Sequence, residues 1–168
     1  MRSIGFSPVA SIDARVLVLG SLPGRMSLQL QQYYGQPRNA FWKLLGRLYD
    51  FDPDAPYAKR VALLQEGNVA LWDVCASAQR PGSLDAAIAA HSVIPNDFAT
   101  FLRRHRRIHT VFFNGRKAAD LFRRLVQPGL PEQFQTLNQV VLPSTSPAHA
   151  AMPFSVKLGH WSQLRHGA

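Results

Sequence analysis

The chain has 168 residues, enough for one compact domain with a sizeable core and too few for two comfortable ones. A mean hydropathy of −0.10, with 46% hydrophobic and 17% charged residues, indicates an ordinary globular protein and excludes the disordered and fibrous classes. The 19 Lys and Arg against 10 Asp and Glu give a net charge of +9, which is typical of a nucleic-acid partner and equally of a protein kept in solution by its charge.

The cysteines, histidines and apolar runs further limit the classes of protein to which the chain can belong. Cys75 is the only cysteine, which excludes disulfide frameworks and Cys-x-x-Cys zinc sites and is typical of a reducing cytoplasm. His105 and His109 have i, i+4 spacing, but the four arginines around them would repel a cation, so we expect neither metal nor cofactor. No signal-like segment and no run of ~18 apolar residues occurs. The sequence therefore predicts a cytoplasmic monomer without a membrane segment.

The first half of the chain shows two strands with two helices between them. An apolar run at 15–19, followed by a glycine, is typical of a buried strand, and so is the run at 69–72. Helical periodicity covers 57–65, which ends before Gly67, and 40–49, whose apolar face is Phe41, Leu44, Leu45 and Leu48.

The second half repeats this alternation. A helix at 97–106, capped by Asn96, precedes a strand at 110–113, and a helix at 117–126 precedes a strand at 139–142. Their apolar stripes are Phe98, Phe101 and Leu102, then Leu121, Phe122 and Leu125. Alternating strands and helices predict one α/β domain over 1–168, a three-layer α/β/α architecture around a mostly parallel four-stranded sheet.

Small and polar residues follow every predicted strand. They are the segment 20–24, Asp73, Asn114 with Gly115, and the segment 143–147. Ligands of open α/β sheets bind outside the carboxyl ends of the strands, so these residues converge on a candidate pocket. Each alone is as well explained by turn formation, since Gly, Pro, Asn, Asp and Ser make turns, but four together favour a site.

Segment 20–24 does not carry a nucleotide-binding motif. Only three residues separate Gly20 from Gly24, and Arg25 and Met26 follow instead of Gly-Lys-Ser/Thr, so it is not a P-loop. A third glycine at the position required for dinucleotide binding is also absent. Nucleotide-dependent enzymes are therefore weakly supported.

Together the strand ends resemble the uracil-DNA glycosylase superfamily over residues 16–161. The segment 20–24 is similar to its Gly-x-Asn/Asp/Glu-Pro motif, 38–42 to its Asn-x-Phe-Trp segment, and 142–148 to the Ser-Pro motif of its DNA-intercalating loop. The segments 71–74, 80–85 and 112–118 also match. The resemblance implies a DNA repair enzyme that hydrolyses the N-glycosidic bond of a damaged base.

Two departures point to one branch. Leu22 stands where most branches place a water-positioning Asn, Asp or Glu, and Ser144 stands where the uracil-specific branch has His. Both substitutions resemble the deoxyinosine (hypoxanthine) glycosylase branch, in which Asn39 takes over the catalytic role. We therefore expect hypoxanthine, with uracil as an alternative, to be excised without a covalent enzyme adduct.

The resemblance also implies a role for each site residue. Asn39 aligns the attacking water, with Asp73 in support, and Tyr34 stacks on the flipped base. The other residues expected in the base pocket are Ser21, Leu22, Phe41 and Asn114, and those expected to contact DNA are Ser144, Thr145, Ser146, Ala148 and His149. Structural alternatives remain open at this stage: Asn39 as a helix N-cap, Asp73 as a turn cap and Tyr34 as a core aromatic.

Other functions also remain open. A non-catalytic nucleic-acid or nucleotide-binding α/β module would explain why Leu22 replaces a catalytic residue. A phosphate-ester hydrolase is disfavoured because the chain lacks a metal cluster and a P-loop. The arginine-rich segment 103–107 precedes a strand, so we expect it to face away from the pocket.

Overall fold

A parallel four-stranded sheet forms the centre of the molecule in a computed structural model that describes residues 1–168. Its strands are β2 (Val16–Gly20), β3 (Val69–Asp73), β6 (Thr110–Asn114) and β7 (Asn138–Leu142), in the order β3-β2-β6-β7. Every neighbouring pair is parallel. The predicted sheet is therefore confirmed, and all four carboxyl ends lie at one edge.

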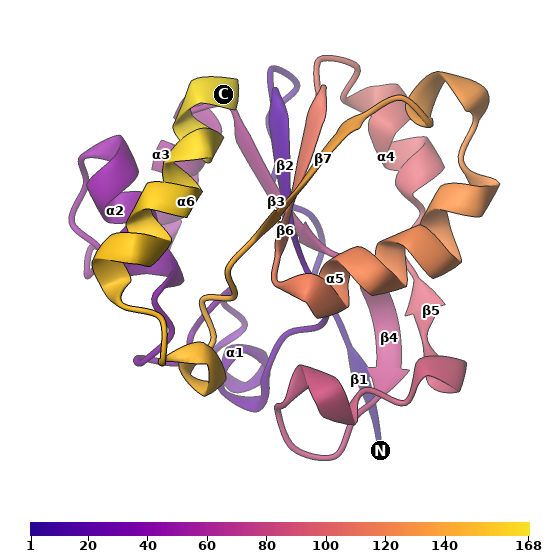
Figure 1. Cartoon of the computed structure of the whole chain (residues 1–168), viewed down its shortest axis with the longest axis horizontal. Helices are drawn as coiled ribbons and strands as arrows, with labels where there is room; N and C mark the ends of the chain where they lie inside the picture. The colour runs from indigo at the N-terminus through magenta and orange to yellow at the C-terminus, as the bar shows by residue number, and fades with distance from the viewer.

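Helices cover both faces of this sheet, which makes three layers (Figure 1). On one face lie α2 (Phe41–Tyr49), α3 (Tyr57–Glu66) and α6 (Phe154–Gly167); on the other lie α4 (Phe98–Arg104) and α5 (Arg116–Leu121). Alternate side chains of β2 pack into two separate cores, because successive strand residues point to opposite faces of the sheet. The predicted three-layer α/β/α architecture is confirmed.

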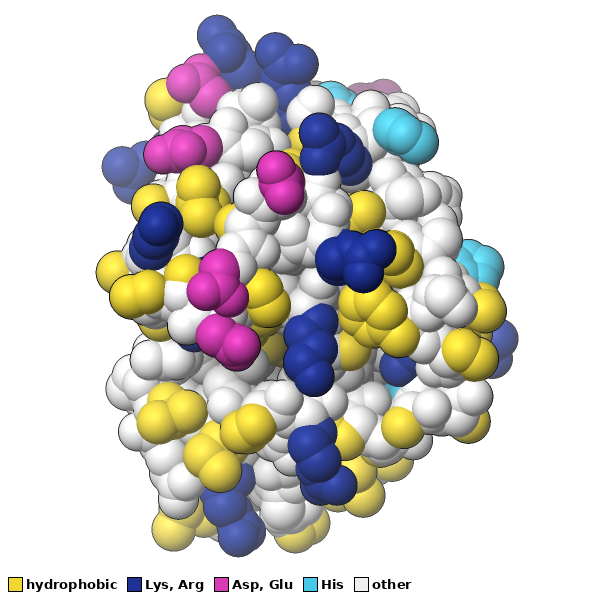
Figure 2. Space-filling model, turned by 90° about the vertical axis from the view of Figure 1, so that its left-hand side faces the viewer, with side chains coloured by type: hydrophobic (Ala, Val, Ile, Leu, Met, Phe, Trp, Pro, Cys, Tyr) yellow, Lys and Arg dark blue, Asp and Glu magenta, His cyan; other side chains and the backbone are white.

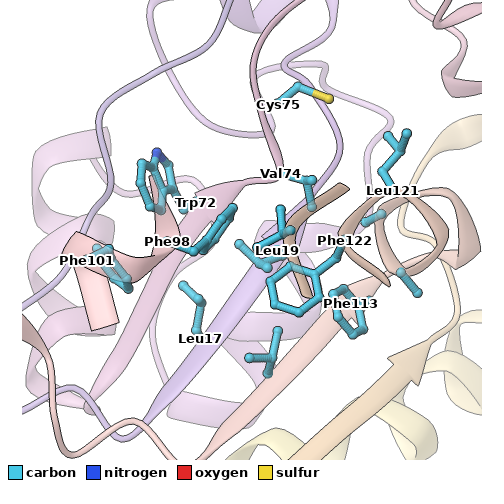
Figure 3. Packing of buried hydrophobic residues seen from close by; sticks show 14 of the residues in the cluster. Leu17, Leu19, Trp72, Val74, Cys75, Phe98, Phe101, Phe113, Leu121 and Phe122 are labelled. Carbon is cyan, nitrogen blue, oxygen red and sulfur yellow. The ribbon is translucent and has the colours of Figure 1, made fainter. Parts of the chain in front are cut away.

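The core under α4 and α5 is rich in aromatic rings. Figure 3 shows Trp72, Phe98, Phe113 and Phe122 around Leu19. The ring centroids of Trp72 and Phe98 are 4.9 Å apart, and those of Phe98 and Phe122 are 5.4 Å apart. Burying each such side chain stabilises the fold by about 1.5–3 kcal/mol, so this core holds the carboxyl edge of the sheet rigidly.

A second, antiparallel sheet was not predicted. Its strands are β1 (Arg2–Ile4), β4 (Cys75–Gln79) and β5 (Ile94–Pro95), in the order β1-β4-β5. Only Val74 separates β4 from β3, so this sheet continues the chain beyond the carboxyl edge of the main sheet (Figure 1). The remaining elements are the helix α1 (Arg25–Leu30), the 3-10 turns η1 (Asp85–Ala87), η2 (Ala90–Ser92), η4 (Gln127–Gly129), η5 (Glu132–Phe134) and η6 (Pro147–His149), and the π-helical turn η3 (Phe122–Val126).

Two details of the predicted helices were wrong. Asn96 does not cap α4: the Asp97 side chain accepts the N–H of Thr100 at 3.1 Å, and Asn96 bonds to β3 instead. Leu125 does not pack in the core but is 39% exposed. The wider π turn of η3 rotates the helix, so Val126 takes the buried position.

The C-terminal helix α6 was also not predicted. It packs on α2 and buries Trp161 and Leu164, and the rings of Phe41 and Trp161 lie 6.0 Å apart. No helix of the chain combines the length and the apolar character that a membrane span requires.

Candidate active site

A pocket of about 840 Å³ lies at the carboxyl edge of the parallel sheet. All the predicted site residues except Phe41 line it: Ser21, Leu22, Tyr34, Asn39, Asp73, Asn114, Ser144, Thr145, Ser146, Ala148 and His149. A smaller hollow of about 230 Å³, beside Arg104 and His105, contains none of them. The segment 103–107 does not line the larger pocket, as predicted.

Asp73, the last residue of β3, is only 4% exposed at this pocket. Burial raises the pKa of its carboxyl group to about 7; the nearby Asp85 adds to the shift and Arg80 opposes it. Its Oδ2 atom is buried without a hydrogen-bond partner. Its backbone carbonyl accepts a hydrogen bond from Asn96 Nδ2 at 2.7 Å, which fixes the strand end. The backbone of Asp73 is thus held in place, while Oδ2 of its carboxyl group remains free to accept a hydrogen bond.

Gly20 lets Asp73 and Tyr34 approach the end of β2. A Cβ atom at residue 20 would lie 2.5 Å from Asp73 Oδ1 and 3.0 Å from the Tyr34 hydroxyl oxygen. The glycine is therefore needed for close approach. Two polar groups from distant parts of the chain flank one point beside the pocket.

The ring of Tyr34 stacks on Phe41, with centroids 4.0 Å apart and planes at 24°. Phe41 is fully buried, so it lies behind Tyr34 and does not reach the pocket. The Tyr34 hydroxyl is buried without a hydrogen-bond partner of normal geometry. Burial, with the nearby Asp73, raises its pKa far above the usual range, and the Asn114 side chain beside it opposes the shift. Tyr34 is thus both a core aromatic and part of the pocket wall, with a neutral hydroxyl available to donate.

Asn39 lines the pocket just before α2. Its Oδ1 atom accepts the backbone N–H of Phe41, the first residue of α2, at 2.9 Å. The N-cap of α2 is Ala40, so this bond belongs to the turn just before the helix, and Asn39 is not the N-cap considered as the alternative. An amide oxygen has two lone pairs, so the bond orients the side chain and leaves a second acceptor site. Holding this turn and aligning water are therefore compatible roles.

Asn114 joins two loops at the pocket wall. Its Nδ2 donates to Thr145 Oγ1 at 2.9 Å, and its Oδ1 accepts the Thr145 backbone N–H at 2.9 Å. The Thr145 carbonyl in turn accepts the N–H of Ala40 at 3.0 Å. Asn114 and Thr145, both buried, thus hold the loop after β7 against the start of α2. The predicted contacts of Asn114 with the base and of Thr145 with DNA must therefore use the lone pairs and hydrogens that this pairing does not occupy.

The loop after β7 forms one rim of the pocket. Ser144 Oγ accepts the N–H of Ser146 at 3.2 Å, and Ser146 Oγ accepts the N–H of Ala148 at 3.3 Å. Each hydroxyl hydrogen remains available for a phosphate oxygen. Ala148 and His149 are exposed at the mouth of the pocket.

The opposite rim depends on Arg80, which begins the matched segment 80–85 but was given no role from the sequence. This arginine is 5% exposed, donates from Nη1 to the Leu22 carbonyl at 3.0 Å and from Nη2 to the Pro23 carbonyl, and lies 3.7 Å from Asp85. The Leu22 side chain packs into the core beneath. Arg80 follows the unpredicted strand β4, so its contacts with the segment 22–23 were not predicted.

Hydrogen bonding and stacking are the chemistry this arrangement offers. No group of three His, Cys, Asp or Glu side chains that could hold a metal ion occurs in the structure. Figure 2 shows Lys and Arg side chains running down the side of the molecule that carries α2, α3 and α6, and no acidic side chain in the lowest part of that view. Such a surface attracts a polyanion.

Comparisons with known proteins agree with this site. The model of the uracil DNA glycosylase superfamily matches residues 7–163. The "Hypoxanthine DNA glycosylase" of Methanosarcina barkeri is 36% identical over 121 residues, which cover 71% of this chain and 75% of that protein. The protein of the same name from Methanosarcina acetivorans is 37% identical over 117 residues, covering 69% and 73%. A solution structure of a candidate uracil DNA glycosylase from M. acetivorans superposes with a TM-score of 0.82 at 32% identity, covering 99% of this chain and 98% of that one.

Proposed function

Because this chain belongs to the uracil DNA glycosylase superfamily and is a DNA N-glycosylase, we propose that it removes hypoxanthine from DNA and leaves an abasic site. One observation carries the proposal. The pocket at the carboxyl edge combines the Tyr34 ring, the Asn39 amide and the unpartnered carboxyl group of Asp73. The names of the two Methanosarcina relatives support this choice of base.

The target nucleotide must leave the helix to reach these groups. Extruding a base costs a few kcal/mol, and a mispaired base costs least, which favours hypoxanthine opposite a poor partner. Tyr34, backed by Phe41, replaces the lost stacking with a fixed aromatic face. Ala148 lies at the exposed rim, where a small side chain enters the space that the base leaves.

The glycosidic bond breaks toward an oxocarbenium-like sugar, so catalysis requires a placed water and a stabilised departing base. Asn39 aligns the water through the second lone pair of Oδ1, since the first is held by Phe41 N–H. Leu22 supplies no polar atom for this task. Asp73 faces the base and supports catalysis by accepting a hydrogen bond that orients the base in the pocket.

Phosphate contacts hold the DNA across the pocket mouth. The hydroxyl groups of Ser144 and Ser146 retain donors, and the net charge of +9 draws the polyanion to the protein. His149 lies exposed on the same rim, within reach of the same backbone. Uracil, which is smaller than hypoxanthine and likewise carries a ring N–H beside a carbonyl group, is the second substrate we propose.

The test is single-turnover incubation with a duplex carrying one deoxyinosine, followed by alkali. We expect alkali-labile sites at the deoxyinosine and none in an undamaged duplex. Borohydride should trap no covalent adduct, because the proposed nucleophile is water. An adduct would instead demand an amine nucleophile, and an uncut strand with normal DNA binding would favour the non-catalytic module.

A further inference from the structure

Five exposed arginines lie at the amino edge of the parallel sheet, where its strands begin, opposite the pocket at the carboxyl edge. Four belong to the segment that ends α4 and leads into β6, and the fifth directly precedes β2. They are Arg15, Arg103, Arg104, Arg106 and Arg107, here called the arginine cluster. The backbone N–H of His109 donates to the Arg15 carbonyl at 3.0 Å, which holds the two segments together. Figure 1 shows the loop between α4 and β6 at the end of the molecule opposite α1, which borders the pocket.

Little negative charge compensates the arginine cluster. Only Arg107 has a carboxylate partner, Asp13, with Nη1 2.7 Å from Oδ1. No Asp or Glu occurs between residues 98 and 119. Compensation of the helix dipole explains the two arginines in the last turn of α4, but the other three lie outside any helix. On the side that carries α2, α3 and α6, by contrast, Figure 2 shows acidic side chains among the basic ones. The arginine cluster is therefore an almost uncompensated positive surface.

The smaller hollow, of about 230 Å³, gives this surface a concave border. Its lining residues are Pro8, Ala10, Ile12, Arg104 and His105. The His105 ring stacks on Phe101 with centroids 4.3 Å apart, and its Nδ1 donates to the Phe101 carbonyl at 2.9 Å. These contacts fix one wall of the hollow in place. Arg104 thus stands between the other arginines and a rigid recess that an anionic group can approach.

The chemistry of the arginine cluster fits a phosphate backbone. A guanidinium group binds a phosphate through two parallel N–H···O bonds, and all five cations of the cluster are arginines. Duplex DNA presents about one negative charge per 1.7 Å of its axis, so one segment can meet several of these groups at once. Because the chain is a DNA N-glycosylase, DNA is also the polyanion nearest to it.

We propose that the arginine cluster binds the backbone of a second DNA segment while the pocket holds the first. The five residues of β2 or β6 separate the cluster from the pocket by about 16 Å, before the loops at either end are added. A straight duplex across the pocket mouth therefore does not reach the cluster. Two separate surfaces let the protein contact a new segment before it releases the old one, whichever base the pocket excises.

The experiment follows the transfer of the protein from a short, labelled, undamaged duplex to an unlabelled competitor duplex by stopped-flow fluorescence anisotropy. Direct transfer requires both duplexes to be bound at once, so the dissociation rate of the wild type should rise with competitor concentration. Arg103→Gln with Arg104→Gln should reduce this dependence by ~10-fold, because two phosphate contacts are lost. The same double variant should excise hypoxanthine from a short duplex at the wild-type single-turnover rate, since the pocket is unchanged.

Two further variants make the result decisive. Arg47→Gln with Lys59→Gln removes two charges from exposed positions of α2 and α3 and should leave transfer unchanged. Arg103→Lys with Arg104→Lys keeps both charges of the cluster and should retain most of the transfer. Normal transfer without the two cluster arginines, an equal loss in the α2 and α3 variant, or a complete loss in the lysine variant would each overturn the proposal. Because the transfer assay uses undamaged DNA, a wild type inactive on deoxyinosine would refute the proposed function alone.

Discussion

Replacing Asp73 with Asn should stabilise the protein at pH 8 even though it weakens the binding of the base. Burial raises the pKa of this carboxyl from 3.8 to about 7. Between these values the unfolded chain binds fewer protons than the folded chain, so the free energy of unfolding falls as pH rises, by about 1.4 kcal/mol per unit of pH. The ionised carboxylate therefore costs the folded protein on the order of 4 kcal/mol above pH 7.

Asp73→Asn removes this cost, and the amide stays neutral at every pH. The difference in unfolding free energy between the variant and the wild type should grow by about 2 kcal/mol from pH 5 to pH 7 and level off near pH 8. Urea denaturation of both proteins at pH 5, 6, 7 and 8 measures this difference directly.

The exposed Asp13→Asn control should show no such rise, because its carboxyl is not buried. A flat difference, or a variant that loses stability relative to the wild type as pH increases, would refute the reasoning. Either result would mean that Arg80 compensates the buried charge, and that Asp73 is a structural ion-pair partner instead of a group held ready for a ligand.

Three further predictions concern the pocket and its rim. Asn39→Ala should lower the single-turnover rate by ~10²-fold and the free energy of unfolding by ~1 kcal/mol, whereas Asn39→Asp keeps the hydrogen bond to Phe41 N–H and should restore stability. A near-wild-type rate in Asn39→Ala would leave Asn39 with a structural role alone. Tyr34→Phe keeps the ring stacked on Phe41 and removes the unpartnered hydroxyl, so thermal stability should be unchanged while the rate of hypoxanthine excision falls by about tenfold. An unchanged rate would show that the hydroxyl takes no part in base recognition. Affinity for a substrate-analogue duplex should fall log-linearly with salt, and salt-independent binding would contradict the phosphate contacts.

The parallel sheet was predictable because its strands are short, apolar and buried on both faces. When helical segments lie between such runs, few structures other than a parallel sheet can accommodate them. The antiparallel sheet was not, since β5 has two residues and β4 consists largely of small residues that carry no strand pattern. Helix α6 was hidden for a related reason: Lys157 occupies a buried position of its inner stripe, beside Trp161 and Leu164.

The location of the site followed from the strand ends, but the contacts of its residues did not. Sequence order places Asp73 and Asn114 at one sheet edge, and both line the pocket there. It does not reveal that Asn114 pairs with Thr145, or that Phe41 lies behind Tyr34, because those contacts depend on loop conformations fixed by distant residues. The contacts of Arg80, in the matched segment 80–85, were not predicted for the same reason.

The central claim is that this pocket hydrolyses the glycosidic bond of hypoxanthine in DNA. Its most direct test is chromatographic measurement of the free base released from a deoxyinosine duplex by excess protein in the presence of EDTA. The account predicts one free hypoxanthine per duplex, an uncut strand that breaks only on alkali treatment, and a ~10²-fold slower release by Asn39→Ala. Strand cleavage without free hypoxanthine, or no release from a duplex that the protein binds, would contradict it.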